Sequence, residues 1–210
     1  MQDRMTIAVT KGDRIVGQQL ALLAQIGIEP HDDMLTSRKL VFTTKHPNVE
    51  LLLLRGSDVA TYVEHGIADL GMAGRDVLLE HGEEGYYQPL DLKLGRCRIM
   101  VAGLKDELPL PGRLRIATKF VKTAKQHYAE QGVQVDIIKL YGAMELAPVT
   151  GLAHRIVDIV ETGNTLKANG LVAMEHIADV STRLIVNKTA MKMKYSTIHQ
   201  LIEQLRGVVG

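Results

Sequence analysis

Short apolar runs alternate with amphipathic stretches along this chain. Residues 5–9 (MTIAV) and 49–54 (VELLLL) are mainly apolar on consecutive positions, which is typical of strands that are buried on both faces of a sheet. Between them, apolar residues over 15–26 recur at the spacing of one helix face. Strands that alternate with helices in this way predict an α/β architecture.

The alternation continues as far as residue 104. A helix is predicted to begin at Ser57 or Asp58 and to end before Gly66, because serine and aspartate cap helix starts and glycine commonly follows helix ends. Three further elements are predicted in this part: a strand over 68–72, a helix over 75–81 and a strand over 98–104.

Residues 105–113 (KDELPLPGR) interrupt the pattern with two prolines, a glycine and four charged side chains, a composition typical of a linker. Beyond them the alternation restarts, and Pro148 is expected to disturb one short helix. Strands are predicted over 114–118, 135–140, 156–160 and 181–187, and helices over 120–131, 144–147, 165–169 and 194–205.

The break predicts two α/β lobes that are joined by a hinge at 105–113. We assign residues 1–104 together with 181–210 to lobe I, and residues 105–180 to lobe II. In this arrangement the last strand and helix return to the first lobe, so the chain crosses between the lobes twice.

The segment from 155 to 171 (RIVDIVETGNTLKANGL) points most directly to chemistry. An apolar strand leads into a loop with Thr162, Gly163 and Asn164, and a helix is predicted to open at Thr165. Peptide N–H groups at a helix start bind anions, a glycine lets the backbone approach the anion, and threonine hydroxyls donate hydrogen bonds. The pattern predicts a phosphate-binding loop.

Two carboxylates flank this loop, Asp158 on the strand and Glu161 directly after it. Carboxylates repel phosphate, but they accept hydrogen bonds from ribose hydroxyls and bind Mg²⁺. The acids therefore favour a ligand that carries a sugar or a metal ion besides its phosphate. The alternative is a strand-to-helix turn without a ligand, capped by threonine or asparagine, which is common in α/β folds.

Composition limits the possible partners. The 210 residues have a formal net charge of +1, and 4% are aromatic with no tryptophan. Bulk attraction to nucleic acid or to an anionic membrane is therefore not expected. No signal peptide is visible, and the most apolar run, Leu51–Leu54, is too short to cross a bilayer, so we expect a cytoplasmic protein. The single Cys97 cannot form an internal disulfide.

Basic residues near strand ends are candidates for binding phosphates. Arg55 directly follows a predicted central strand, and α/β proteins bind ligands at strand ends. Lys11, in the turn after the strand at 5–9, is a further candidate. Guanidinium groups offer a charged fork to phosphate oxygens, which adds Arg14 and Arg38 to the candidates. The alternative for each is a solvated surface charge.

Five blocks of sequence together resemble a known family, ATP phosphoribosyltransferase, the first enzyme of histidine biosynthesis. Its loop for phosphoribosyl pyrophosphate (PRPP) is similar to the Thr-Gly-x-Thr that follows Asp158 here. One departure is Asp13, which separates Gly12 from Arg14 where the family runs Lys-Gly-Arg. The blocks are TKG at 10–12, LRGSDV at 54–59, DLGMAGRD at 69–76, ELAP at 145–148 and IVDIVETGNTLKANGL at 156–171.

The resemblance implies a two-lobed fold like that of type II periplasmic binding proteins, with the active site in the cleft between the lobes. It implies that N1 of ATP attacks C1 of PRPP and releases pyrophosphate, with Mg²⁺ carried by the substrate phosphates rather than by protein ligands. The length is similar to the family's short form, which works with a regulatory subunit that resembles histidyl-tRNA synthetase. We expect a homodimer when the chain is alone.

The resemblance also assigns roles to residues. Arg14 and Arg38 are expected to be catalytic, facing the reacting centre and stabilising the departing pyrophosphate. Lys11, Arg55 and Glu145 are expected to bind nucleotide or phosphate, although an acid in the first turn of a helix would also explain Glu145. The expected PRPP-binding residues are Asp158, Glu161, Thr162, Gly163, Asn164 and Thr165.

Two other classes of protein remain as alternatives. A solute- or effector-binding module could have the same two-lobed fold without catalysis. A nucleobase phosphoribosyltransferase would use the same PRPP loop, but those enzymes usually carry two adjacent acids before it, whereas Asp158 and Glu161 are separated here.

Overall fold

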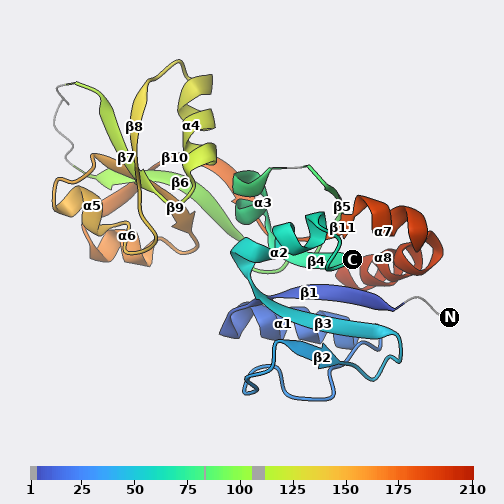
Figure 1. The fold of residues 1–210 in the computed structure, drawn as a ribbon. Helices are drawn as coiled ribbons and strands as arrows, with labels where there is room; N and C mark the ends of the chain where they lie inside the picture. Colours follow the sequence, from blue (N-terminus) through green and yellow to red (C-terminus); the bar gives the residue numbers. More distant parts are fainter. Residues whose placement is uncertain (1–3, 83, 106–111) are drawn as a thin grey trace. The chain divides into compact units, whose positions relative to one another are not determined.

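The computed structural model describes residues 4–82, 84–105 and 112–210 (Figure 1). The chain divides into two compact units, one of residues up to Gly95 together with Ser181–Gly210, the other of Arg96–Val180. Each unit is built on one mixed β-sheet. None of the helices in the described residues is long and apolar enough to span a membrane.

The boundary between the units differs from the predicted one. Strand β6 (Cys97–Leu104), which we assigned to lobe I, pairs with two strands of the second sheet. The chain therefore passes between the units near residue 95 and near residue 180, and the break at 105–113 leads from one strand of the second unit to the next. Residues 106–111 of the expected hinge lie outside the described residues. Proline and glycine mark a loop, but they do not tell a loop within a domain from one between domains.

The first unit holds a six-stranded sheet in the order β2-β3-β1-β4-β11-β5. Strands β1, β3 and β4 run parallel, and the others pair antiparallel with their neighbours. The last strand and the C-terminal helix complete this unit, as predicted, together with a helix over Lys188–Met193 that was not predicted. Its elements are β1 (Met5–Lys11), α1 (Asp13–Ala24), β2 (Val41–Thr43), β3 (Val49–Arg55), α2 (Gly56–Glu64), β4 (Leu70–Gly74), α3 (Arg75–His81), β5 (Tyr86–Asp91), β11 (Thr182–Asn187), α7 (Lys188–Met193) and α8 (Tyr195–Val209).

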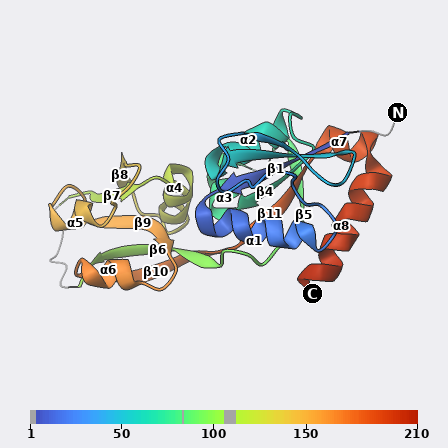
Figure 2. The same ribbon diagram turned by 90° about the horizontal axis from the view of Figure 1, so that it is seen from below.

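Helices cover both faces of this sheet, which explains the continuous apolar runs of its strands (Figures 1 and 2). On β1, Ile7 and Val9 face one side and pack in a core with residues of α1 and α8, whereas Ala8 faces the other side and packs with α2. All three side chains are fully buried. Successive residues of a strand thus contribute to two different cores.

The approach of α2 to the sheet leaves no room for a side chain at Gly71 on β4. A Cβ atom there would lie 2.7 Å from a methyl carbon of Val59 and 2.8 Å from one of Val63. We expect Gly71→Ala to destabilise the protein by about 1–3 kcal/mol through overpacking, measured by thermal or urea unfolding. The control is Gly17→Ala on α1, where no atom lies within 4 Å; it should stabilise the helix slightly, and equal destabilisation by both changes would contradict the packing argument.

The second unit holds a five-stranded sheet in the order β10-β6-β9-β7-β8. Strand β7 runs parallel to β8 and β9, while β6 is antiparallel to both of its neighbours. Helices α5 and α6 pack on one face of the sheet. Besides β6, the elements are β7 (Leu114–Thr118), α4 (Val121–Glu130), β8 (Val135–Lys139), α5 (Leu146–Val149), β9 (Arg155–Val160), α6 (Asn164–Ala168) and β10 (Leu171–Val180).

Candidate functional site

The predicted phosphate-binding loop connects β9 to α6 in the second unit. Thr162, Asn164 and Thr165 are exposed, whereas Leu166 is buried in the core and anchors the first turn of the helix. The N–H of Asn164 donates a hydrogen bond of 3.4 Å to the Thr162 hydroxyl oxygen. The loop therefore presents polar groups to solvent from a backbone that is held by the core.

Gly163 shapes this loop through its backbone conformation. Its φ of 80° lies in the left-handed region, which glycine adopts without the strain that other residues meet. A Cβ atom at this position would touch nothing closer than a Val160 methyl at 3.9 Å. The requirement for glycine thus comes from φ and not from a lack of space.

Asp158 lies on β9 before the loop, in a setting that the sequence did not indicate. Its Oδ1 accepts a hydrogen bond of 2.8 Å from the N–H of Ile159 and lies 3.7 Å from Nζ of Lys119. The pKa of Asp158 is raised above its ordinary value, mainly because the carboxyl group is buried, and the negative charge of Glu145 raises it further. The hydrogen bond from Ile159 and the positive charge of Lys119 lower the pKa, but they do not cancel the rise. The structure therefore brings the predicted residues Asp158 and Glu145 into one electrostatic environment.

Lys119 was missed by the sequence analysis. It directly follows β7, which is parallel to β9, so both strands end at the same edge of the sheet. A signal was present in the sequence: Lys119 directly follows a predicted strand, which is the argument that made Arg55 a candidate.

The raised pKa of Asp158 leads to a stability prediction. The Asp158 carboxyl group binds a proton more readily in the folded than in the unfolded protein, so its protonated form stabilises the fold at pH values below its unfolded pKa. This stabilisation is lost as the pH rises through the folded pKa, because the buried group then carries a charge. We expect Asp158→Asn, which keeps an oxygen for the N–H of Ile159, to raise Tm at pH 7 by about 2–4 °C. The gain should shrink as the pH falls toward 3.8, the ordinary value for aspartate.

Thermal unfolding followed by circular dichroism between pH 4 and pH 7.5 measures this effect. The matched control is Asp136→Asn, which removes a carboxylate that is 54% exposed on β8 of the same unit. A Tm difference for Asp158→Asn that is independent of pH, or that matches the control, would show that burial of the charge is not the cause.

In the first unit, two of the predicted basic residues line one pocket. Lys11 and Arg38 lie together around a space of about 230 Å³, with Gly12 and Ser37 among the other lining residues. Arg55 is the β3 partner of Lys11 in the parallel pairing of β1 with β3. Three basic residues that are distant in sequence thus gather at the carboxyl edge of this sheet.

The end of β1 is held in place by buried polar contacts. The N–H of Thr10 donates to Oε1 of Gln19 at 2.8 Å, and the Thr10 hydroxyl donates to the carbonyl oxygen of Met72 at 2.7 Å. Gln19 is fully buried on α1. These bonds fix the backbone from which Lys11 projects. Arg14 lies in the first turn of α1, and its side chain is outside the described residues.

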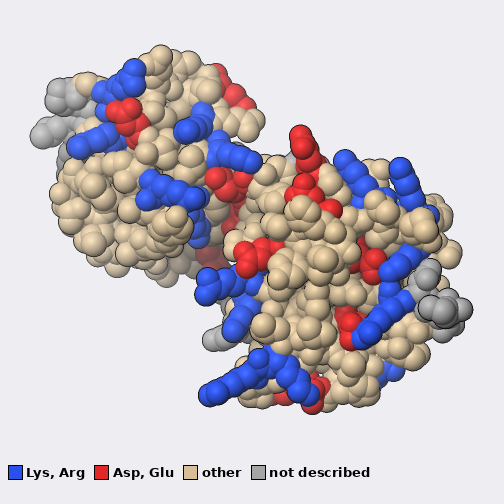
Figure 3. All heavy atoms as spheres, viewed as in Figure 1, with Lys and Arg blue, Asp and Glu red and all other residues tan. Residues whose placement is uncertain are grey.

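The predicted site residues therefore form two groups, one in each unit. Lys11, Arg38 and Arg55 belong to the first, while Glu145 and the loop from Asp158 belong to the second. Their placement in one shared cleft stays a prediction. Figure 3 shows Lys and Arg interspersed with Asp and Glu on the visible face, and the formal net charge is +1. Binding of an anion therefore has to depend on local groups such as these.

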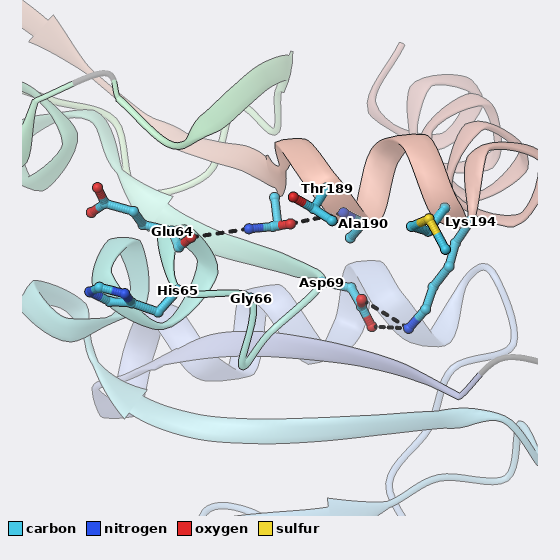
Figure 4. A pocket seen from close by; sticks show the side chains of 9 residues that line it. Glu64, His65, Gly66, Asp69, Thr189, Ala190 and Lys194 are labelled. Atoms are coloured by element: carbon cyan, nitrogen blue, oxygen red, sulfur yellow. Dashed lines mark hydrogen bonds and ion pairs between the residues drawn. The ribbon is translucent and has the colours of Figure 1, made fainter.

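A second pocket, of about 360 Å³, lies at the opposite edge of the first sheet (Figure 4). Asp69, directly before β4, accepts from Nζ of Lys194 at 2.9 Å with both oxygens and from the N–H of Thr6 at 2.9 Å. Nζ of Lys194 also donates to the carbonyl oxygen of Arg4 at 2.6 Å. These polar groups bind one another and connect the end of α7 to the sheet. We therefore assign them a role in stabilising the fold and none in binding a ligand.

Comparison with known proteins points to one family. A sequence model described as ATP phosphoribosyltransferase matches residues 55–207. An ATP phosphoribosyltransferase of Saccharophagus degradans is 60% identical over 207 residues, which cover 99% of this chain and 97% of the relative. Another, of Marinobacter nauticus, is 58% identical over 209 residues, which cover 100% of this chain and 97% of the relative.

Solved structures point to the same family and to the same fold. A chain of the ATP phosphoribosyl transferase (HisG:HisZ) complex from Thermotoga maritima is 33% identical, with a TM-score of 0.86 and coverage of 98% of both chains. The periplasmic aliphatic sulphonate binding protein SsuA of Escherichia coli has a TM-score of 0.60 at 12% identity, covering 100% of this chain and 73% of SsuA. The second likeness concerns the fold alone, and it confirms the predicted type II periplasmic-binding-protein-like fold.

Proposed function

The chain belongs to the ATP phosphoribosyltransferase family, and from this we propose that it transfers the phosphoribosyl group of PRPP to N1 of ATP, giving N1-(5-phosphoribosyl)-ATP and pyrophosphate in the first step of histidine biosynthesis. The observation that supports it most is the loop at Gly163. A left-handed glycine, exposed hydroxyls and a half-buried carboxylate stand together there, as a ligand with both phosphate and ribose requires.

The loop from Glu161 to Thr165 is assigned to the 5-phosphate of PRPP. Its peptide N–H groups and the hydroxyls of Thr162 and Thr165 are the donors that phosphate oxygens need. Asp158 and Glu161 accept hydrogen bonds from the ribose hydroxyls, which holds C1 of the sugar in a fixed place. Glu145, whose charge acts on Asp158, is assigned to the nucleotide.

The reaction needs alignment and charge stabilisation more than proton transfer. Adenine N1 carries a lone pair and no proton, so no general base has to create the nucleophile. The departing pyrophosphate accumulates negative charge, which fixed cations stabilise. We assign this work to Arg14 and Arg38, with Lys11 and Arg55 binding phosphate oxygens beside them.

Mg²⁺ is the metal ion that the family implies, and the residues beside the loop suit it only in part. Asp158 and Glu145 offer hard oxygen atoms, but no group of three or more metal-binding side chains occurs in the described ranges. We propose that the phosphates of PRPP and ATP carry the ion. When bound, it screens their charge and makes pyrophosphate a better leaving group.

A single assay separates this function from its alternatives. The protein is mixed with Mg²⁺, PRPP and ATP, and the ultraviolet absorbance change from substitution of the adenine ring at N1 is followed. A binding module gives no change, and a nucleobase phosphoribosyltransferase reacts with a free base instead of ATP. Either result would remove the proposal.

We also propose partners for the chain. The Thermotoga relative was solved as a HisG:HisZ complex, which supports a regulatory subunit resembling histidyl-tRNA synthetase for this chain too. A homodimer is proposed when the chain is alone, and sedimentation analysis tests it. A cytoplasmic location is proposed because ATP and PRPP are cytoplasmic metabolites.

A further inference from the structure

Lys119 is placed by the fold beside the phosphate-binding loop. In the parallel pairing of β7 with β9, Thr118 is the partner of Val157, so the residues that follow, Lys119 and Asp158, lie side by side. The distance of 3.7 Å between Nζ of Lys119 and Oδ1 of Asp158 shows that the side chain extends toward the loop. A cation therefore stands next to the strand that leads into the anion site.

The backbone around Lys119 is fixed. The hydroxyl of Thr118 donates to the carbonyl oxygen of Val157 at 2.6 Å and accepts from the N–H of Phe120 at 2.8 Å. Thr118 is fully buried and Phe120 is 3% exposed, whereas the side chain of Lys119 is 41% exposed. Two buried neighbours thus hold the position of a lysine whose charged end remains accessible to a ligand.

The contact between Lys119 and Asp158 is too loose to explain this arrangement as a structural ion pair. At 3.7 Å the contact is longer than an ordinary hydrogen bond and therefore weak, and partly exposed pairs contribute little to stability. Nζ also lies 4.9 Å from the centre of the Phe120 ring. Neither contact would be costly to exchange for a phosphate oxygen.

The charge around the loop favours a cation of this kind. Asp158, Glu145 and Glu161 carry carboxylates at this edge of the sheet, and PRPP is itself a polyanion. Without a nearby positive charge, the acids that suit the ribose would repel the phosphates of the same molecule. Lys119 already offsets the charge of Asp158, and it can do so for PRPP.

We propose that Lys119 is a PRPP-binding residue, whose ammonium group moves from Asp158 to a phosphate oxygen of the bound substrate and leaves Asp158 free for a ribose hydroxyl. The inference rests on the proposed function and adds a binding residue to the same site. No covalent step is involved, because the change is an exchange of ionic partners.

The test compares Lys119→Met with Lys119→Arg and with Lys125→Met. Methionine keeps an unbranched apolar stem and removes the charge, arginine keeps the charge, and Lys125 is an exposed lysine on α4 of the same unit. We expect Lys119→Met to raise the Kd for PRPP in calorimetry, and its KM, at least tenfold. The KM for ATP should stay at the wild-type value. The Tm should fall by no more than about 2–3 °C, because Lys119 offsets part of the buried charge of Asp158 but the pair is partly exposed. Lys119→Arg should remain within about threefold of wild type, and Lys125→Met should be unchanged.

Ribose 5-phosphate and pyrophosphate identify which end of PRPP Lys119 binds. Weaker binding of ribose 5-phosphate alone assigns it to the 5-phosphate, and weaker binding of pyrophosphate alone to the leaving group. Wild-type affinity of Lys119→Met for PRPP and for both probes would overturn the inference, as would an equal loss in Lys125→Met. If the wild-type protein itself binds no PRPP, the proposed function fails and the inference falls with it.

Discussion

Arg38→Ala is expected to lower kcat by about 10²–10³-fold while changing Tm by less than about 2 °C. The pyrophosphate that leaves PRPP gains charge in the transition state, and removal of one fixed donor to such a charge has an effect of this size. Arg38 is exposed and lines the pocket at the end of β1 with Lys11, so its loss opens no cavity in the core. Steady-state kinetics and thermal unfolding measure the two quantities.

The matched control is Arg206→Ala. Arg206 is an exposed arginine on α8, and its Nε lies 3.3 Å from a carboxylate oxygen of Glu203. It is not among the residues that line the pocket of Lys11 and Arg38. We expect it to keep the wild-type kcat. Arg14→Ala should behave like Arg38→Ala if both arginines act on the leaving group. An unchanged kcat for Arg38→Ala, or a rise in KM alone, would remove Arg38 from the stabilisation of the transition state.

Elements with regular patterns and glycine ends were predicted closely. The helix at 75–81 and the strand at 114–118 match α3 and β7 residue for residue. Gly66, expected to end a helix, has a φ of 71°, and Gly170, which directly follows the helix predicted over 165–169, has a φ of 74°. These signals are local: a buried strand needs apolar side chains, and a helix end needs a residue that tolerates the left-handed conformation.

Elements that depend on tertiary pairing were missed. Strand β10 carries two register shifts, between Ala173 and Glu175 and between His176 and Ala178, so its side chains do not alternate regularly and no strand pattern appears. Strands β2 and β5 and helix α7 were also missed. The expectation that Pro148 would disturb a helix at 144–147 was wrong: α5 covers Leu146–Val149 and includes Pro148, since the first turn of a helix needs no N–H donor there.

The candidate site was only partly predictable for the same reason. The loop at Gly163 is one continuous segment, so its residues could be identified together. The gathering of Lys11 and Arg38 at one pocket depends on how residues 25–40 fold back on the sheet, and no periodic pattern in that stretch predicts it. The burial of Asp158, which sets its pKa, likewise depends on packing of distant segments.

Gly163→Val is expected to weaken PRPP binding by about 100-fold or more. The φ of 80° at this position is strongly unfavourable for a β-branched residue, so the backbone of the loop has to rotate to accommodate valine. That rotation turns the peptide N–H groups around Gly163 away from the position of the phosphate. The nearest atom to a new Cβ is 3.9 Å away, so the expected loss arises from backbone conformation and not from a clash.

Calorimetry with PRPP measures this loss. Comparison of Gly163→Ala with Gly170→Ala shows whether the loss comes from the amides at Gly163 or from lower stability of α6. Gly170 follows the other end of α6 with a φ of 74° and no atom within 4 Å of a new Cβ, so alanine meets nearly the same strain there. Both alanine variants should lower Tm equally, while only Gly163→Ala should weaken PRPP binding. Equal losses of affinity would mean that PRPP binding depends on the stability of α6 and that the amides at Gly163 do not hold the phosphate.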